Sequence, residues 1–163
     1  MISVANTVLV NEPGEEVLLT RDDVWHGLNL KAENALPFVP AMTKCEFIER
    51  TDEGAIIRDI EYRGQEAREL VTFTPKEQVQ FHRIGGEVMG DIYNTIGEDA
   101  DGNLTLTFSY DLILPDVEPG GPEEQEYSDR MSDDYKAVVI ATLAALRRWV
   151  AEGKPDVADI TAA

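Results

Sequence analysis

Hydrophobic and polar residues alternate with a period of two over about 70 residues in the middle of the chain. This alternation predicts β-strands that bury one face and expose the other. We expect a first strand over residues 3–10 and further strands over 43–50, 55–62, 65–74, 78–84, 87–98 and 103–114. The links between them are short and rich in turn residues, including Arg63-Gly64 and Gly85-Gly86, which we interpret as hairpin turns. Short links leave no room for crossover helices, so neighbouring strands should be antiparallel.

A long helix is predicted after the last strand, from about Ser128 to Glu152. At ~1.5 Å per residue it would be ~36 Å long, enough to cross a whole sheet. Gly153 and Pro155 are typical of a helix end. Apolar side chains recur at steps of three and four residues, as expected for a core-facing helix: Met131, Tyr135, Val138, Thr142, Leu146 and Trp149.

A shorter helix is predicted between the first two strands. Thr20 can cap it, and Asp23 stands three positions later, where a capping box places its acid. Leu28 continues the helical spacing, and Pro37 and Pro40 interrupt it. We therefore expect one short helix followed by a second short helix or a bend.

The order of strand, short helix, six strands and long helix predicts an α+β fold in which a strongly curved antiparallel sheet of about seven strands wraps around the C-terminal helix. This order resembles the helix-grip fold of the START superfamily, whose members include the birch-pollen allergen. Four segments are similar to the AtaL-like family within it: LTRDDVWHGL (19–28), LPFVP (36–40), RELVTFTP (68–75) and LTLTFSY (104–110). The resemblance implies a hydrophobic ligand cavity between sheet and final helix, and it supplies no catalytic residue. We expect a single domain over 1–154 and a C-terminal tail over 155–163.

The hairpin lengths also predict which side chains face each other across the sheet. A two-residue turn at Arg63-Gly64 pairs Arg58 with Glu69, and the next hairpin pairs Glu69 with Arg83. The three side chains would then form a charge row on the inner face of the sheet. The row either orients an acidic or carbonyl-bearing ligand or is a structural ion pair near the rim of the sheet.

The other inner positions are mostly apolar, and they include Val88, Ile92, Ile96 and Leu106. Tyrosine rings can pack there while their hydroxyl groups reach a ligand. The predicted ligand-binding residues are Arg58, Ile60, Tyr62, Glu69, Phe73, Phe81, Arg83, Asn94, Phe108, Tyr110, Tyr135, Val138 and Thr142. Glu69 is the single residue that we consider as a catalytic acid or base.

The charge and composition narrow the classes of partner. A net charge of −18 over 163 residues disfavours nucleic acid and anionic membranes. We expect no membrane insertion, because no apolar run approaches the ~20 residues needed to span a bilayer.

A single cysteine and the absence of a signal-peptide pattern at the N-terminus favour the cytoplasm. His26 and His82 lack metal-ligand spacing, and Gly85-Gly86 is no phosphate loop, so we expect neither a metal nor a cofactor.

Two functional hypotheses follow. The first is a protein that binds or carries a small hydrophobic molecule, with aromatic or polyketide-like ligands among those considered. The alternative is a cyclase, aromatase or hydrolase that uses the same cavity. The sequence leaves the ligand, the reaction and the oligomeric state open.

Overall fold

The computed structural model describes residues 1–154, and the predicted tail over 155–163 lies outside the described residues. Seven strands form one antiparallel sheet in the order β1-β7-β6-β5-β4-β3-β2. Each strand from β2 to β6 pairs with the next strand along the chain, and β1 pairs with β7 to form the far edge. The elements are β1 (Ile2–Leu9), α1 (Arg21–Glu33), β2 (Met42–Arg50), β3 (Ile56–Tyr62), β4 (Gln65–Thr74), β5 (Gln78–Gly86), β6 (Met89–Glu98), β7 (Leu104–Ile113) and α2 (Pro122–Ala151).

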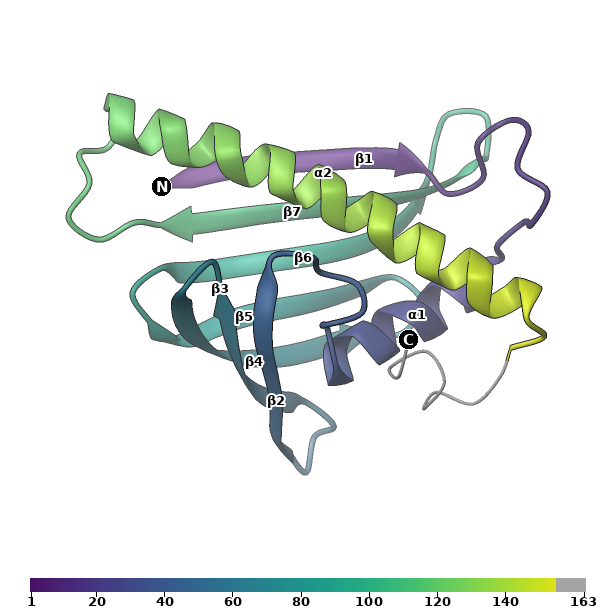
Figure 1. Ribbon diagram of the computed structural model, residues 1–163, viewed down its shortest axis with the longest axis horizontal. Helices are drawn as coiled ribbons and strands as arrows, with labels where there is room; N and C mark the ends of the chain where they lie inside the picture. The colour runs from purple at the N-terminus through teal and green to yellow at the C-terminus, as the bar shows by residue number, and fades with distance from the viewer. Residues whose placement is uncertain (155–163) are drawn as a thin grey trace.

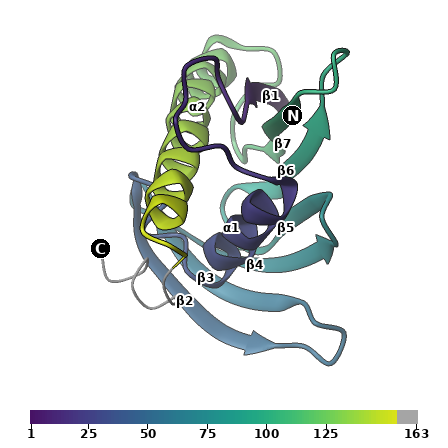
Figure 2. The same ribbon diagram turned by 90° about the vertical axis from the view of Figure 1, so that its right-hand side faces the viewer.

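The sheet curves around the two helices, and both lie on its concave side (Figures 1 and 2). Helix α2 runs diagonally across the sheet and contacts β1, β7 and α1. Helix α1 lies against β5 and β6 on the same side. This is the predicted α+β helix-grip arrangement. Neither helix within residues 1–154 combines the length and the apolar character needed to cross a membrane.

Local chemistry explains where α1 begins and ends. The backbone amide of Asp23 donates to the Thr20 hydroxyl at 3.1 Å, and the Thr20 amide donates to the Asp23 carboxylate at 2.9 Å. This confirms the predicted capping box, whose loss typically costs about 1 kcal/mol. After the helix the chain bends through turns, and the amides of Phe38 and Val39 both donate to the carbonyl of Ala35.

Helix α2 begins at Pro122, earlier than the predicted start near Ser128. Proline suits the first helical position because its missing N–H has no partner there in any helix. Glu123 and Glu124 complement the helix dipole in the first turn. At ~1.5 Å per residue, the 30 residues of α2 extend ~45 Å.

The prediction of a hairpin turn at Gly85-Gly86 is wrong. Both glycines belong to β5, where they pair with Arg68 and Ala67 across a β-bulge, and the chain turns after them. Gly86 has φ of +117°, and a Cβ there would lie 2.7 Å from the carbonyl oxygen of Glu66. The glycine therefore serves a close backbone approach within the bulge rather than a turn.

The remaining predicted strand pairings agree with the structure. Arg58 pairs with Glu69, and Glu69 with Arg83. Alternate residues of β3 are buried, as its hydrophobic pattern predicts. The stripe predicted on the final helix is buried as a whole: Met131, Tyr135, Val138, Thr142, Leu146 and Trp149.

Candidate functional site

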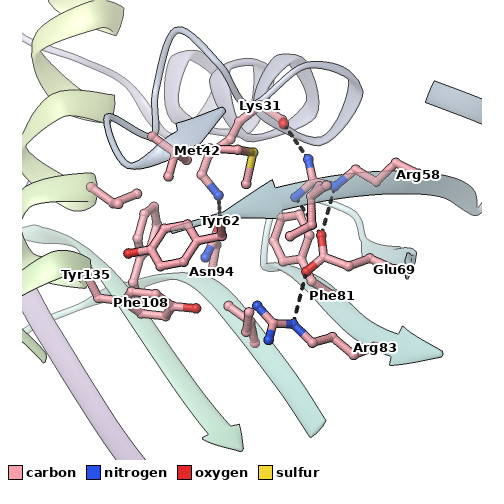
Figure 3. Close-up of a pocket in the computed structure, with 14 residues that line it drawn as sticks. Lys31, Met42, Arg58, Tyr62, Glu69, Phe81, Arg83, Asn94, Phe108 and Tyr135 are labelled. Carbon is pink, nitrogen blue, oxygen red and sulfur yellow. Dashed lines mark hydrogen bonds and ion pairs between the residues drawn. The ribbon is translucent and has the colours of Figure 1, made fainter. Parts of the chain in front are cut away.

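The charge row of Arg58, Glu69 and Arg83 lies inside the molecule. Their side chains are 3%, 1% and 7% exposed, respectively. Arg58 Nε donates to Glu69 Oε1 at 2.9 Å, whereas Arg83 Nε lies 3.7 Å from Glu69 Oε2. The row is therefore buried beneath the helices and does not lie at a wet rim (Figure 3).

Helix α1 fixes the position of Arg58. One terminal nitrogen of Arg58 donates to the carbonyl oxygens of Lys31 at 3.0 Å and Ala32 at 3.1 Å. These carbonyls belong to the last turn of α1, where a helix leaves carbonyl groups without internal partners. The guanidinium of Arg58 thus donates both to the free carbonyls at the end of α1 and to the carboxylate of Glu69.

Lys31 belongs to the same site, although the sequence analysis did not include it. Its Nζ donates to Asn94 Oδ1 at 2.9 Å and lies 4.6 Å and 5.0 Å from the ring centroids of Phe81 and Phe108. Burial, reinforced by the nearby positive charge of Arg58, lowers the pKa of Lys31 from 10.5 to about 7.

A signal for Lys31 was present in the helical spacing. Val24, Leu28 and Lys31 follow one another at steps of four and three residues, so they share one face of α1. Val24 and Leu28 are fully buried, and Lys31 continues their stripe into the cavity. A charged residue on an apolar helical stripe is uncommon enough to mark a candidate site.

These side chains line a cavity of about 40 Å³ between the sheet and α2, which is room for a few water molecules. Figure 3 shows its polar end, formed by the charge row and Lys31, and the aromatic rings beside it. The predicted residues that line it are Arg58, Ile60, Tyr62, Glu69, Phe81, Arg83, Asn94, Phe108, Tyr135 and Val138. Lys31, Val39, Met42 and Ile92 also line it, and only Ile92 had been placed on the inner face from the sequence.

Three predicted site residues lie away from the cavity. Phe73 packs edge-on against Trp25, with ring centroids 6.3 Å apart. The Tyr110 hydroxyl donates to the carbonyl of Ser128, and burial raises the pKa of Tyr110 to about 12. Thr142 donates to the carbonyl of Val138 within α2, so its hydroxyl is satisfied by its own helix. All three side chains point to the predicted inner side, but they contact neighbouring groups there and do not line the cavity.

One edge of the cavity is closed by a contact between α2 and the β3–β4 hairpin. The Tyr62 hydroxyl donates to Asp134 at 2.8 Å, and Arg63 donates to both oxygens of Asp134 at 2.6 Å and 2.5 Å. Burial raises the pKa of Asp134, but the hydrogen bonds from Arg63 and Tyr62 outweigh it and lower that pKa overall. Burial and the Asp134 carboxylate both raise the pKa of Tyr62.

The histidines lie away from the cavity, whereas Cys45 accepts from Arg58 at 3.7 Å without lining the cavity itself. His26 stacks on Trp149 with ring centroids 4.7 Å apart, and His82 contacts Asp91 on the exposed side of the sheet. Cys45 accepts a hydrogen bond from the amide of Ala35 at 3.4 Å. In the described part of the chain, no group of three or more His, Cys, Asp or Glu side chains is arranged to hold a metal ion.

The family model described as acetylaranotin biosynthesis cluster protein L matches residues 4–153. A curated protein with the same description, from Aspergillus terreus (strain NIH 2624 / FGSC A1156), is 24% identical over 153 residues. The alignment covers 93% of this chain and 91% of that protein.

Solved structures with a similar fold include a START superfamily protein from Mycobacterium smegmatis, with a TM-score of 0.64, 13% identity, and coverage of 91% of this chain and 99% of that one. The Zhui aromatase/cyclase from Streptomyces sp. R1128 gives a TM-score of 0.61 at 17% identity, covering 91% and 94% of the two chains. The di-domain ARO/CYC StfQ from the steffimycin biosynthetic pathway gives 0.65 at 12% identity. That match covers 88% of this chain and 49% of StfQ, so the chain spans about half the length of the di-domain protein. The TM-scores establish that these proteins share the helix-grip fold with this chain. At identities of 12–17%, the likeness is one of fold alone.

Proposed function

Because this chain belongs to the AtaL family and has a START-type helix-grip fold, we propose that it binds a small hydrophobic molecule carrying an acidic or carbonyl oxygen. The binding site is the cavity between the sheet and α2. The observation that carries the proposal is the excess of buried positive charge there. Among the described lining residues, the two guanidinium groups of Arg58 and Arg83 and the partly protonated amine of Lys31 stand against one carboxylate, Glu69.

The excess of positive charge favours an anionic or electron-rich ligand. The net charge of the whole chain is −18, so the cavity has a sign opposite to that of its surroundings. In a medium of low dielectric constant, a ligand oxygen gains more from a nearby cation than it would in water. The rest of the wall is apolar or aromatic, which suits the hydrocarbon part of such a ligand.

Arg83 supports the same ligand chemistry. Its Nε is buried and has no hydrogen-bond acceptor among the described residues, since Glu69 Oε2 at 3.7 Å is too distant. A buried donor without an acceptor typically costs about 1–3 kcal/mol. A carboxylate or carbonyl oxygen of a ligand would recover that free energy.

The cavity volume sets a condition on ligand size. Ligand pockets usually enclose ~300–1,000 Å³, whereas this cavity measures about 40 Å³. A ring-sized ligand therefore requires side chains at the wall, such as Met42, Tyr62 and Tyr135, to move outward. The Tyr62–Asp134 contact lies at this wall and is the natural place for the cavity to widen.

Calorimetric titration with 1-naphthoate and with its neutral analogue 1-naphthylmethanol tests the proposal. We expect the carboxylate to bind at least tenfold more tightly, since a charge-assisted hydrogen bond contributes about 1.5–3 kcal/mol. Native mass spectrometry of the purified protein provides a second measurement, because a co-purifying acid or ketone would identify the natural ligand class. Equal affinity for the two probes, or no binding of either, would contradict the proposal.

A cyclase or aromatase function is the second candidate, and one observation favours it. Lys31 places an amine with a pKa of about 7 inside the cavity, where it can exchange a proton near neutral pH. Glu69 is less suited to that role, because both of its oxygens face guanidinium groups. The described lining residues include no Ser, Cys or His, so they offer no hydroxyl or thiol nucleophile of the kind used with a histidine base in many hydrolases. Unchanged turnover of an identified substrate by Glu69→Gln would remove Glu69 as the acid or base.

A further inference from the structure

We propose that Lys31 is a reactive amine that forms an imine with a carbonyl compound bound in the cavity. The inference rests on the proposed function, since the carbonyl compound must first enter the same cavity. It goes beyond ligand binding because it assigns a covalent step to one atom, Lys31 Nζ.

The first support is the position of the amine. Nζ lies at the cavity wall, close to the rings of Phe81 and Phe108, and among the described residues it makes one hydrogen bond, to Asn94 Oδ1. Figure 3 shows this nitrogen pointing from α1 toward Asn94 on β6. An amine held by one acceptor keeps a lone pair available when it is neutral.

The second support is that, within residues 1–154, no carboxylate is paired with Lys31 alone. Buried lysines are normally paired with an acid, but the two oxygens of Glu69 face Arg58 and Arg83 instead. Arg58 also adds a positive charge beside Lys31. Desolvation together with a neighbouring cation is a recognised way in which proteins activate a lysine nucleophile.

The protonation of Lys31 agrees with this role. The other ionisable groups around Lys31 in the described part of the chain come from four strands and α2: Cys45 on β2, Arg58 and Tyr62 on β3, Glu69 on β4, Arg83 on β5 and Tyr135 on α2. Burial first, and Arg58 second, lower the pKa of Lys31 to about 7, while Glu69 and Cys45 act in the opposite direction. A large share of Lys31 is therefore neutral slightly above neutral pH, when exposed lysines remain charged.

The chemistry balances without an oxidant or a reductant. The Nζ lone pair forms a bond to the carbonyl carbon, and the π electrons of the carbonyl move onto its oxygen. The resulting carbinolamine loses that oxygen as water, together with the two hydrogens of the amine, and a C=N bond forms. With a 1,3-dicarbonyl compound, the imine tautomerises to a conjugated enaminone that water hydrolyses slowly.

Acetylacetone is a suitable probe because it is small and its enaminone absorbs in the near ultraviolet. The folded protein would be incubated with acetylacetone at pH 7.5 and followed by absorption, intact mass and peptide mapping. We expect one adduct, whose mass is that of acetylacetone less one water, on the peptide that contains Lys31. Its rate of formation should rise with pH around a midpoint near 7, as the pKa of Lys31 requires.

Variants separate Lys31 from the other lysines. Lys31→Arg and Lys31→Met should each abolish the adduct, whereas Lys44→Arg, which changes a lysine that is 42% exposed, should leave it intact. The mapping in the wild-type protein decides the question even if a variant folds poorly. An adduct spread over exposed lysines, or none at all, would overturn the inference.

The naphthoate titration distinguishes failure of this inference from failure of the proposed function. If 1-naphthoate binds and acetylacetone does not react with Lys31, the cavity is a binding site and Lys31 is no nucleophile. If neither probe enters, both proposals are wrong.

Discussion

Glu69 is the residue that joins the two arginines of the charge row. A buried ion pair adds little net stability over apolar side chains, yet removing one partner leaves an uncompensated buried charge. Here two guanidinium groups depend on one carboxylate that is 1% exposed. Glu69 therefore affects both the stability of the fold and the chemistry of the cavity. The same is true of Lys31.

Glu69→Gln should lower the free energy of unfolding by about 3 kcal/mol or more, because Arg58 loses its buried charge partner. Urea unfolding measures the effect. Arg68→Gln is the matched control, since Arg68 pairs with Asp59 on the outer face of the sheet and is 49% exposed. That exposed pair should contribute less than about 1 kcal/mol. Equal losses in the two variants would show that the charge row is not buried as described.

Lys31 should make the wild-type protein more stable at pH 9 than at pH 7. Its pKa is lowered in the folded state from 10.5 to about 7, so between these values the unfolded chain binds more protons. Stability therefore rises with pH in this window, by roughly 2–3 kcal/mol at pH 9, and is insensitive to Lys31 below pH 7. Lys31→Met should lose this dependence in urea unfolding at the two pH values. A parallel pH response in both proteins would mean that Lys31 titrates normally.

At the scale of elements, α1 and the β3–β4 hairpin determine the shape of the cavity. The end of α1 holds Arg58 and supplies Lys31, while the hairpin is tied to α2 through Asp134. Gly27 allows α1 and α2 to approach closely, because a Cβ there would overlap the side chain of Leu146. The cavity is thus formed by packing between elements rather than by any one strand.

Asp134→Asn should loosen α2 from the hairpin and speed the entry of ligands. The variant loses the charge that accepts from Arg63 and Tyr62, so we expect faster hydrogen exchange in the β3–β4 hairpin and faster association of 1-naphthoate in stopped flow. Asp133→Asn, on the exposed face of α2, is the control and should change neither rate.

In the wild type, the contribution of Asp134 to the free energy of unfolding is complete above pH 3.8 and is lost as the pH falls through its lowered pKa. Unchanged exchange in Asp134→Asn would show that the contact does not restrain the hairpin.

At the scale of the whole molecule, the surface and the cavity have opposite charge. The net charge of −18 produces self-repulsion over the surface, while Arg58, Arg83 and the partly protonated Lys31 lie around the cavity. Salt should affect these two regions differently. Exposed charges are screened, whereas buried pairs such as Arg58–Glu69 are screened much less.

The melting temperature should rise between 0.01 M and 1 M NaCl, because the Debye length falls from about 30 Å to about 3 Å and surface repulsion is screened. Thermal unfolding followed by circular dichroism measures the shift. Glu69→Gln serves as a control, since the loss of a buried pair should lower the melting temperature by a similar amount at both salt concentrations. A melting temperature that falls with salt would show that surface ion pairs, rather than repulsion, dominate.

The sequence by itself determined the strands, their pairing and the inner face of the sheet. Hairpin lengths and a period of two are local properties, so the sequence alone places Arg58, Glu69 and Arg83 opposite one another. It misplaced the turn at Gly85-Gly86 because a β-bulge depends on the backbone of the neighbouring strand.

Only the tertiary structure decided what reaches the cavity and how large it is. Lys31 lies on the apolar face of α1, but its contact with Asn94 depends on how α1 packs against β6. The predicted inner side is correct for Tyr110, Phe73 and Thr142. Their side chains nevertheless contact a neighbouring ring or a backbone carbonyl instead of the cavity. Periodicity assigns a face to each residue, whereas the free space left on that face is determined by side chains that are distant in the sequence.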